Sequence, residues 1–141
     1  MLHTQRSYGG SCVAPHHLAA SAGRDVLKQG GNAVEAMVAA AAAIAVVYPH
    51  MNALGGDGFW LIHEPGKAPV AIDACGPAAQ LANRDFYSGE SQIPERGPKA
   101  TLTMAGTISG WQEALNVAAG WGSALPLPTL LADAIRHADE G

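Results

Sequence analysis

The chain has 141 residues, of which 48% are hydrophobic and only 14% are charged. This balance excludes an intrinsically disordered chain, which combines low hydrophobicity with high charge. The net charge of -4 gives no basic surface for nucleic acid, so we expect no nucleic-acid partner. Soluble domains carry about a quarter charged residues, and the deficit here predicts that further protein covers much of the surface.

The first elements expected along the chain are a strand and a helix. Residues 10–14 (GSCVA) are small or apolar, which predicts a short edge or buried strand. Residues 16–29 place Leu18, Ala22 and Val26 at helical spacing, so this segment is expected to be an amphipathic helix.

A turn and a second helix follow directly. Gly30 and Gly31 are expected to end the first helix, because glycine adopts the left-handed conformation at low cost. Asn32 is a favourable N-cap for a helix over residues 33–47. Glu35 then occupies the third helical position, where a carboxylate interacts well with the positive end of the helix dipole.

The helix over residues 33–47 is apolar around its whole circumference except at Glu35. Such a helix is buried on all sides, and alanine combines high helix propensity with close approach of neighbouring backbones. The segment barely reaches the minimum length of a membrane span and consists mostly of alanine. We therefore expect a central core helix that ends before Pro49, and no membrane partner.

The second half of the chain is expected to hold a hairpin and two more helices. Residues 59–63 and 70–73 have the composition of strands and Pro65-Gly66 predicts a turn between them, so residues 59–74 are expected to form a β-hairpin. Residues 76–100 are rich in proline, glycine and polar side chains. The remaining predicted elements are a helical turn at 83–87, an extended run at 101–105, and helices at 108–119 and 126–139.

Few residues form a recognisable catalytic or metal-binding pattern. The Gly-Gly-Asp-Gly run at 55–58 lacks the preceding strand, following helix and lysine of a phosphate loop, which favours a tight turn. Adjacent His16 and His17 point in different directions on a helix, so we expect no metal. Asp57 and Asp73 form either a carboxylate pair or, as we favour, two turn caps.

The tryptophans and cysteines also form no pattern typical of a catalytic or metal-binding site. Three tryptophans are expected to pack in the core or at an interface, namely Trp60, Trp111 and Trp121. Cys12 and Cys75 form no CxxC pair, which predicts neither a zinc site nor a disulfide framework. No cofactor is expected. The N-terminal run MLHTQRSYGG has no apolar signal segment, which predicts a cytoplasmic protein.

Several stretches taken in order resemble the N-terminal part of the gamma-glutamyltranspeptidase family. The most specific is AGRDVLKQGGNAVEA at residues 22–36. The others are VAPHHLA at 13–19, YPH at 48–50, GGDGF at 55–59, AGTISGW at 105–111 and LADAIRHADEG at 131–141.

The resemblance implies an α+β fold, the αββα sandwich of N-terminal-nucleophile hydrolases, of which residues 1–141 form an incomplete domain. Family members are precursors that cleave themselves into two subunits. The new N-terminal threonine of the small subunit then attacks a γ-glutamyl amide such as glutathione. The implied partners are the rest of the large subunit and the small subunit.

The resemblance places no catalytic residue in this chain. The family's nucleophile lies in a Thr-Thr-His-like context, and none of the threonines here does: Thr4, Thr101, Thr103, Thr107 and Thr129. We therefore expect the chain alone to be inactive.

One position departs from the family pattern. An arginine after the second hairpin strand holds the substrate α-carboxylate in the family, a task that suits a guanidinium. That position carries Cys75 here. Either another cation replaces the arginine, or the substrate is a different small amide, such as oxamate or a cephalosporin side chain. A third hypothesis is a non-catalytic scaffold module.

Overall fold

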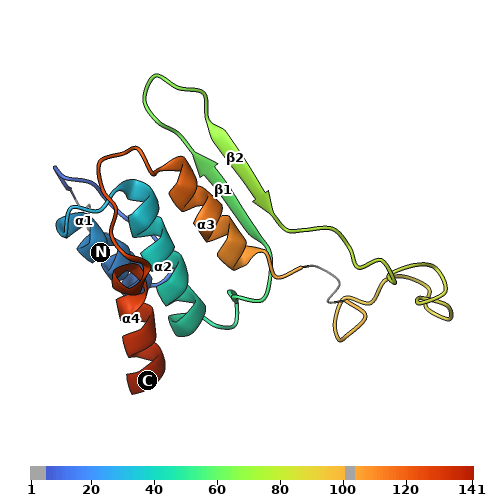
Figure 1. The fold of residues 1–141 in the computed structure, drawn as a ribbon. Coiled ribbons are helices and arrows are strands. Elements are labelled where there is room, and N and C mark those ends of the chain that lie inside the picture. The colour runs from blue at the N-terminus through green and yellow to red at the C-terminus, as the bar shows by residue number, and fades with distance from the viewer. Residues whose placement is uncertain (1–5, 101–103) are drawn as a thin grey trace. The chain divides into compact units, whose positions relative to one another are not determined.

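The computed structural model describes residues 6–100 and 104–141, which hold four helices and one two-stranded antiparallel sheet (Figure 1). The elements follow in the order α1 (His17–Lys28), α2 (Ala33–Val47), β1 (Gly58–Ile62), β2 (Val70–Ala74), α3 (Thr107–Val117) and α4 (Leu127–Glu140). They form two compact units, of which the second comprises Leu54–Gln112 and the first comprises the residues on either side. Among the described residues, none of the helices has both the length and the apolar character that crossing a bilayer requires.

The turn between α1 and α2 needs two glycines for two different reasons. Gly30 has a φ of 89°, and its N–H donates to the Leu27 carbonyl at 3.1 Å. Gly31 donates to the Val26 carbonyl at 3.0 Å, which completes the Schellman motif expected at a helix C-terminus. A Cβ at Gly31 would lie 2.6 Å from the Val26 side chain and 2.9 Å from that of Leu125. Gly30 is therefore required for its conformation, and Gly31 for space.

The N-terminus of α2 is closed by a capping box. The Asn32 side chain accepts hydrogen bonds from the N–H groups of Val34 and Glu35, each at 3.0 Å. In return, Glu35 Oε2 accepts from the Asn32 N–H at 2.8 Å. The predicted N-cap is confirmed, and Glu35 caps the helix as well as facing its dipole.

The second oxygen of Glu35 makes a long-range contact. Its Oε1 accepts from the Leu125 N–H at 2.8 Å, across 90 positions of sequence. Glu35 is only 3% exposed, so both of these hydrogen bonds are shielded from water. One buried carboxylate therefore joins the start of α2 to the segment that leads into α4.

The first unit is built around α2, which packs against both α1 and α4 (Figure 1). A Cβ at Gly23 of α1 would run into the Cys12 sulfur and lie 2.8 Å from the Ala36 carbonyl oxygen, so the two helix backbones lie very close. Most of α2 is buried, as predicted. However, Met37 is 41% exposed, because α1 and α4 leave that side of the helix uncovered. Burial on all sides is therefore corrected to burial on most sides.

The strand predicted over residues 10–14 is wrong for this structure, which places no strand there. A strand requires a neighbouring strand for its hydrogen bonds, and the two strands of the described residues pair only with each other. Val13 is accordingly 83% exposed. Of the extended run predicted at 101–105, residues 101–103 lie outside the described residues.

The second unit is built on the predicted hairpin, which is confirmed. β1 and β2 pair antiparallel with Gly58 opposite Ala74 and Trp60 opposite Ile72. The side chains alternate between two faces, and on the outer face Phe59 and Leu61 are 70% and 78% exposed. The hairpin therefore has one face packed within the unit and one apolar face open.

We predict that Glu35→Gln loosens the junction between α2 and α4. Glutamine keeps one acceptor oxygen but replaces the other with an amide that cannot accept, so one buried N–H loses its partner. Hydrogen bonds to charged groups contribute about 1.5–3 kcal/mol, and hydrogen–deuterium exchange at the Leu125 amide should speed up at least about tenfold. The exposed Glu140→Gln substitution is the control and should leave this rate unchanged. Equal rates in both variants would contradict the bridge.

Candidate functional site

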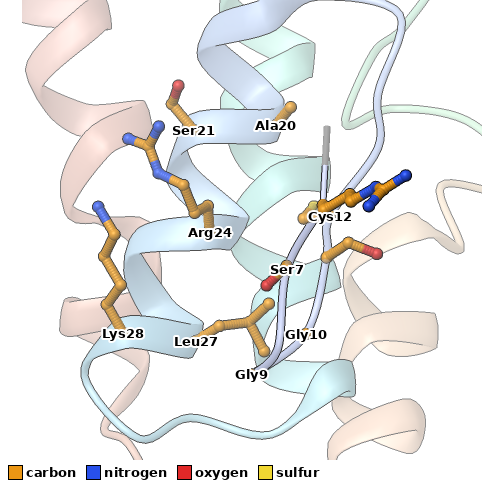
Figure 2. Close-up of a pocket in the computed structure, with 11 residues that line it drawn as sticks. Ser7, Gly9, Gly10, Cys12, Ala20, Ser21, Arg24, Leu27 and Lys28 are labelled. Carbon is orange, nitrogen blue, oxygen red and sulfur yellow. The ribbon is translucent and has the colours of Figure 1, made fainter. Parts of the chain in front are cut away.

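The first unit contains a cavity of about 530 Å³ between the N-terminal segment and α1 (Figure 2). Three cations line it, one of which is Arg6. The other two pair with the Asp25 carboxylate, Arg24 at 3.0 Å and Lys28 at 3.3 Å. Figure 2 shows these side chains leading away from Cys12. Burial raises the pKa of the Cys12 thiol, which keeps it protonated near neutral pH. Among the described residues that line the cavity, none is a His, Asp or Glu that could act as a general base.

The open end of the hairpin is the better candidate site. Because Gly58 lies opposite Ala74, the next residues outward, Asp57 and Cys75, continue from neighbouring strands. Cys75 is half-buried, and the Asp57 charge acts on its thiol. Two acidic side chains and one thiol thus gather where β1 begins and β2 ends, with Asp73 as the second acid.

The start of α3 is tied to this same end of the hairpin. The Thr107 N–H donates to the Gly56 carbonyl at 3.0 Å, and its hydroxyl donates to the same oxygen at 2.8 Å. Thr107 is 9% exposed. The tight turn predicted for the Gly-Gly-Asp-Gly run is therefore fixed by a helix that lies fifty residues further along the chain.

Asp73 sets the electrostatics of Cys75. Its Oδ1 accepts from the Cys75 N–H at 3.1 Å, a turn in which an aspartate binds the backbone two residues on. A hydrogen bond from the thiol to Asp73 raises the pKa of Cys75, and burial and the charges of Asp73 and Asp57 raise it further. The same thiol hydrogen bond lowers the pKa of Asp73. Turn capping by Asp73 is confirmed, and the thiol is a neutral group beside two carboxylates.

His16, His17 and Trp111 have structural contacts. His16 caps α1 by accepting from the Leu18 N–H at 3.2 Å, and its ring stacks on that of His17 with centroids 4.7 Å apart. Trp111 is buried in the second unit. Over residues 6–100 and 104–141, no three His, Cys, Asp or Glu side chains gather as a metal ion requires.

Two of the five threonines lie within the described residues, namely Thr107 and Thr129. The hydroxyl of Thr107 is engaged with the Gly56 carbonyl, and Thr129 lies half-buried in α4. Thr4, Thr101 and Thr103 lie outside the described residues. The Thr107 hydroxyl is bonded to backbone carbonyls and not to a general base, so it lacks the arrangement of an activated nucleophile.

Comparison with known proteins identifies similar chains. The gamma-glutamyltranspeptidase family model matches residues 19–141. The chain is 60% identical over 133 residues to the oxamate amidohydrolase proenzyme of Klebsiella pneumoniae, covering 94% of this chain and 25% of that protein. It is 33% identical over 145 residues to the glutathione hydrolase proenzyme of Escherichia coli, covering 100% of this chain and 24% of the relative.

The fold is also similar to that of a solved structure. Helicobacter pylori gamma-glutamyltranspeptidase matches with a TM-score of 0.84 at 29% identity, covering 99% of this chain and 40% of that one. The expected fold class, a partial α+β segment of an N-terminal-nucleophile hydrolase, is thereby confirmed. The chain spans about a quarter of the length of the curated relatives it matches.

We predict that Asp73→Asn makes the Cys75 thiol more acidic. The carboxylate is the main cause of the raised thiol pKa, so its removal should lower that pKa and move half-maximal alkylation by iodoacetamide to lower pH. Mass spectrometry of the Cys75 peptide over about pH 7–10 measures the profile. Cys12, whose pKa burial alone raises, is the internal control. If the Cys75 profile stays in place, Asp73 does not act on the thiol.

Proposed function

Because the chain belongs to the gamma-glutamyltranspeptidase family, we propose that it opens a precursor whose mature enzyme hydrolyses a small amide without a γ-glutamyl group. Oxamate is the candidate substrate. Relatives in this family are hydrolases, so the scaffold hypothesis has less support than an enzyme. The observation that carries the proposal is the neutral, acid-flanked Cys75 at the end of β2.

The chemistry at Cys75 disfavours a γ-glutamyl substrate. In the family resemblance, this position belongs to an arginine that binds the α-carboxylate of the glutamyl group. A protonated thiol cannot form the paired, charge-assisted hydrogen bonds of a guanidinium. Asp73 and Asp57 would also repel a carboxylate placed here, since like charges at short range disfavour binding.

Oxamate does not require a cation at this position. Its carboxylate is bonded directly to the amide carbon, whereas the α-carboxylate of a γ-glutamyl amide is separated from the amide by the side-chain carbons. The binding group for oxamate must therefore lie beside the nucleophile. The relative named for oxamate shares 60% identity with this chain, against 33% for the relative named for glutathione.

The proposed reaction needs residues beyond this chain. An N-terminal threonine in the remainder of the precursor would attack the amide carbonyl, with its own α-amine as general base. Ammonia leaves, and water then cleaves the acyl ester and releases the acid. The remainder of the precursor is also the proposed partner for the open hairpin face at Phe59 and Leu61, since the chain spans only a quarter of its relatives.

We predict that the full-length precursor hydrolyses oxamate with a higher kcat/KM than glutathione, measured as ammonia and glutamate release. Cys75→Arg should lower KM for γ-glutamyl p-nitroanilide about tenfold, because a charge-assisted pair contributes at least about 1.4 kcal/mol. Cys75→Ser adds no cation and is the matched control. Preferred glutathione hydrolysis by the unmodified enzyme would refute the proposal.

We also predict that the 141-residue chain by itself releases no ammonia from oxamate. The reason is chemical: the described threonines lie inside the chain, so neither can offer the free α-amine that serves as base. Adding the separately produced remainder of the precursor is the positive arm of this assay. Turnover by the chain alone would place a nucleophile within it.

A further inference from the structure

Two glycines, Gly106 directly before α3 and Gly110 within it, press against the end of β2. A Cβ on Gly110 would lie 2.8 Å from the Ala74 Cβ and 3.5 Å from Trp60 Nε1. A Cβ on Gly106 would run into the carbonyl oxygen of Ala74 and lie 2.7 Å from its carbonyl carbon. Neither glycine has a positive φ. The site needs glycine here for space and not for backbone conformation.

These contacts fall on the peptide group that leads into Cys75. The Ala74 carbonyl carbon is bonded to the Cys75 nitrogen, and the N–H on that nitrogen is held by Asp73. With no side chain between helix and strand, the backbone of α3 itself sets the position of this peptide group. Thr107, the first residue of α3, holds Gly56 through hydrogen bonds from its N–H and its hydroxyl. One helical turn therefore positions both edges of the candidate site.

The tight fit is confined to particular glycines. At Gly55, Gly66 and Gly120, a Cβ would meet nothing within 4 Å. Gly120 also lacks a positive φ and follows the end of α3, so alanine there changes neither space nor strain. Gly120 is therefore a matched control for Gly110.

We propose that Gly106 and Gly110 are positioning residues that hold Cys75 at the depth required by the substrate site. This inference rests on the proposed function, in which Cys75 takes the place of the arginine that the family resemblance assigns to substrate binding. Carbon atoms pack best at about 3.5–4.0 Å, so a methyl group at Gly110 would displace Ala74 by about 1 Å. A displacement of this size near a reacting group can lower the rate by about a hundredfold.

The two glycines meet different atoms of Ala74, which gives a sharp test. The obstacle at Gly110 is the Ala74 methyl group, which Ala74→Gly removes. The obstacle at Gly106 is the Ala74 carbonyl oxygen, which glycine retains. Ala74→Gly should therefore rescue Gly110→Ala and fail to rescue Gly106→Ala.

The experiment uses the full-length precursor with Gly110→Ala, Gly106→Ala, Ala74→Gly and both double variants. We predict that Gly110→Ala lowers kcat/KM for oxamate at least about tenfold. It should also shift the pH profile of Cys75 alkylation, which a general loss of stability would not do selectively. Ala74→Gly/Gly110→Ala should return both values to those of Ala74→Gly, and Gly120→Ala should change neither.

The outcomes separate this inference from the proposed function. A shifted thiol profile that the second substitution restores supports positioning by Gly110, even if the unmodified enzyme does not hydrolyse oxamate, in which case only the substrate proposal fails. An unshifted profile in Gly110→Ala overturns the inference. If the Gly110→Ala protein does not accumulate, the Ala74→Gly/Gly110→Ala variant is measured instead. A pH profile of Cys75 alkylation like that of Ala74→Gly supports the inference. Failure of the double variant to accumulate as well overturns it.

Discussion

The buried carboxylate of Glu35 is the interaction on which the first unit depends. It accepts one backbone N–H from Asn32, at the start of its own helix, and one from Leu125, just before α4. A buried charge is tolerated only when hydrogen bonds replace the water it has lost. Both oxygens are satisfied here, so the carboxylate holds α2 and the entry to α4 in one arrangement.

The alanine-rich composition of α2 follows from this arrangement. A helix that packs against α1 on one side and α4 on the other must be thin, because each bulky side chain would push a neighbour away. The contact of Gly23 with the Ala36 backbone shows how close α1 comes. In the second unit, Gly106 and Gly110 allow the same close approach to Ala74, with Cys75 as the residue positioned. In both units, the absence of side chains determines the geometry.

Charge distinguishes the candidate site at the end of β2 more than shape does. A position that the family resemblance assigns to a cation holds a neutral thiol, and Asp73 and Asp57 surround it with negative charge. In the proposed function, this charge disfavours binding of a γ-glutamyl α-carboxylate at this position. The open apolar residues, such as Phe59, are the ones on which we propose that the remainder of the precursor packs.

The sequence by itself determined the features that depend on neighbouring residues. The helix boundary at Gly30, the cap at Asn32 and the two strands of the hairpin depend on local sequence, and the structure confirms each of them. The order of motifs was sufficient to indicate the family. Cys75 could be singled out only through that resemblance, because a lone cysteine carries no pattern of its own.

Only the tertiary structure decided the contacts between distant segments. No local pattern pairs Glu35 with Leu125 or Thr107 with Gly56, since each pair meets only after several elements have packed. The spacing of Gly106 and Gly110, which puts both on one helix face, was the one available signal for the tight contact with Ala74. Residues 10–14 illustrate the converse: their composition favours a strand, but a strand exists only where another strand supplies its hydrogen bonds.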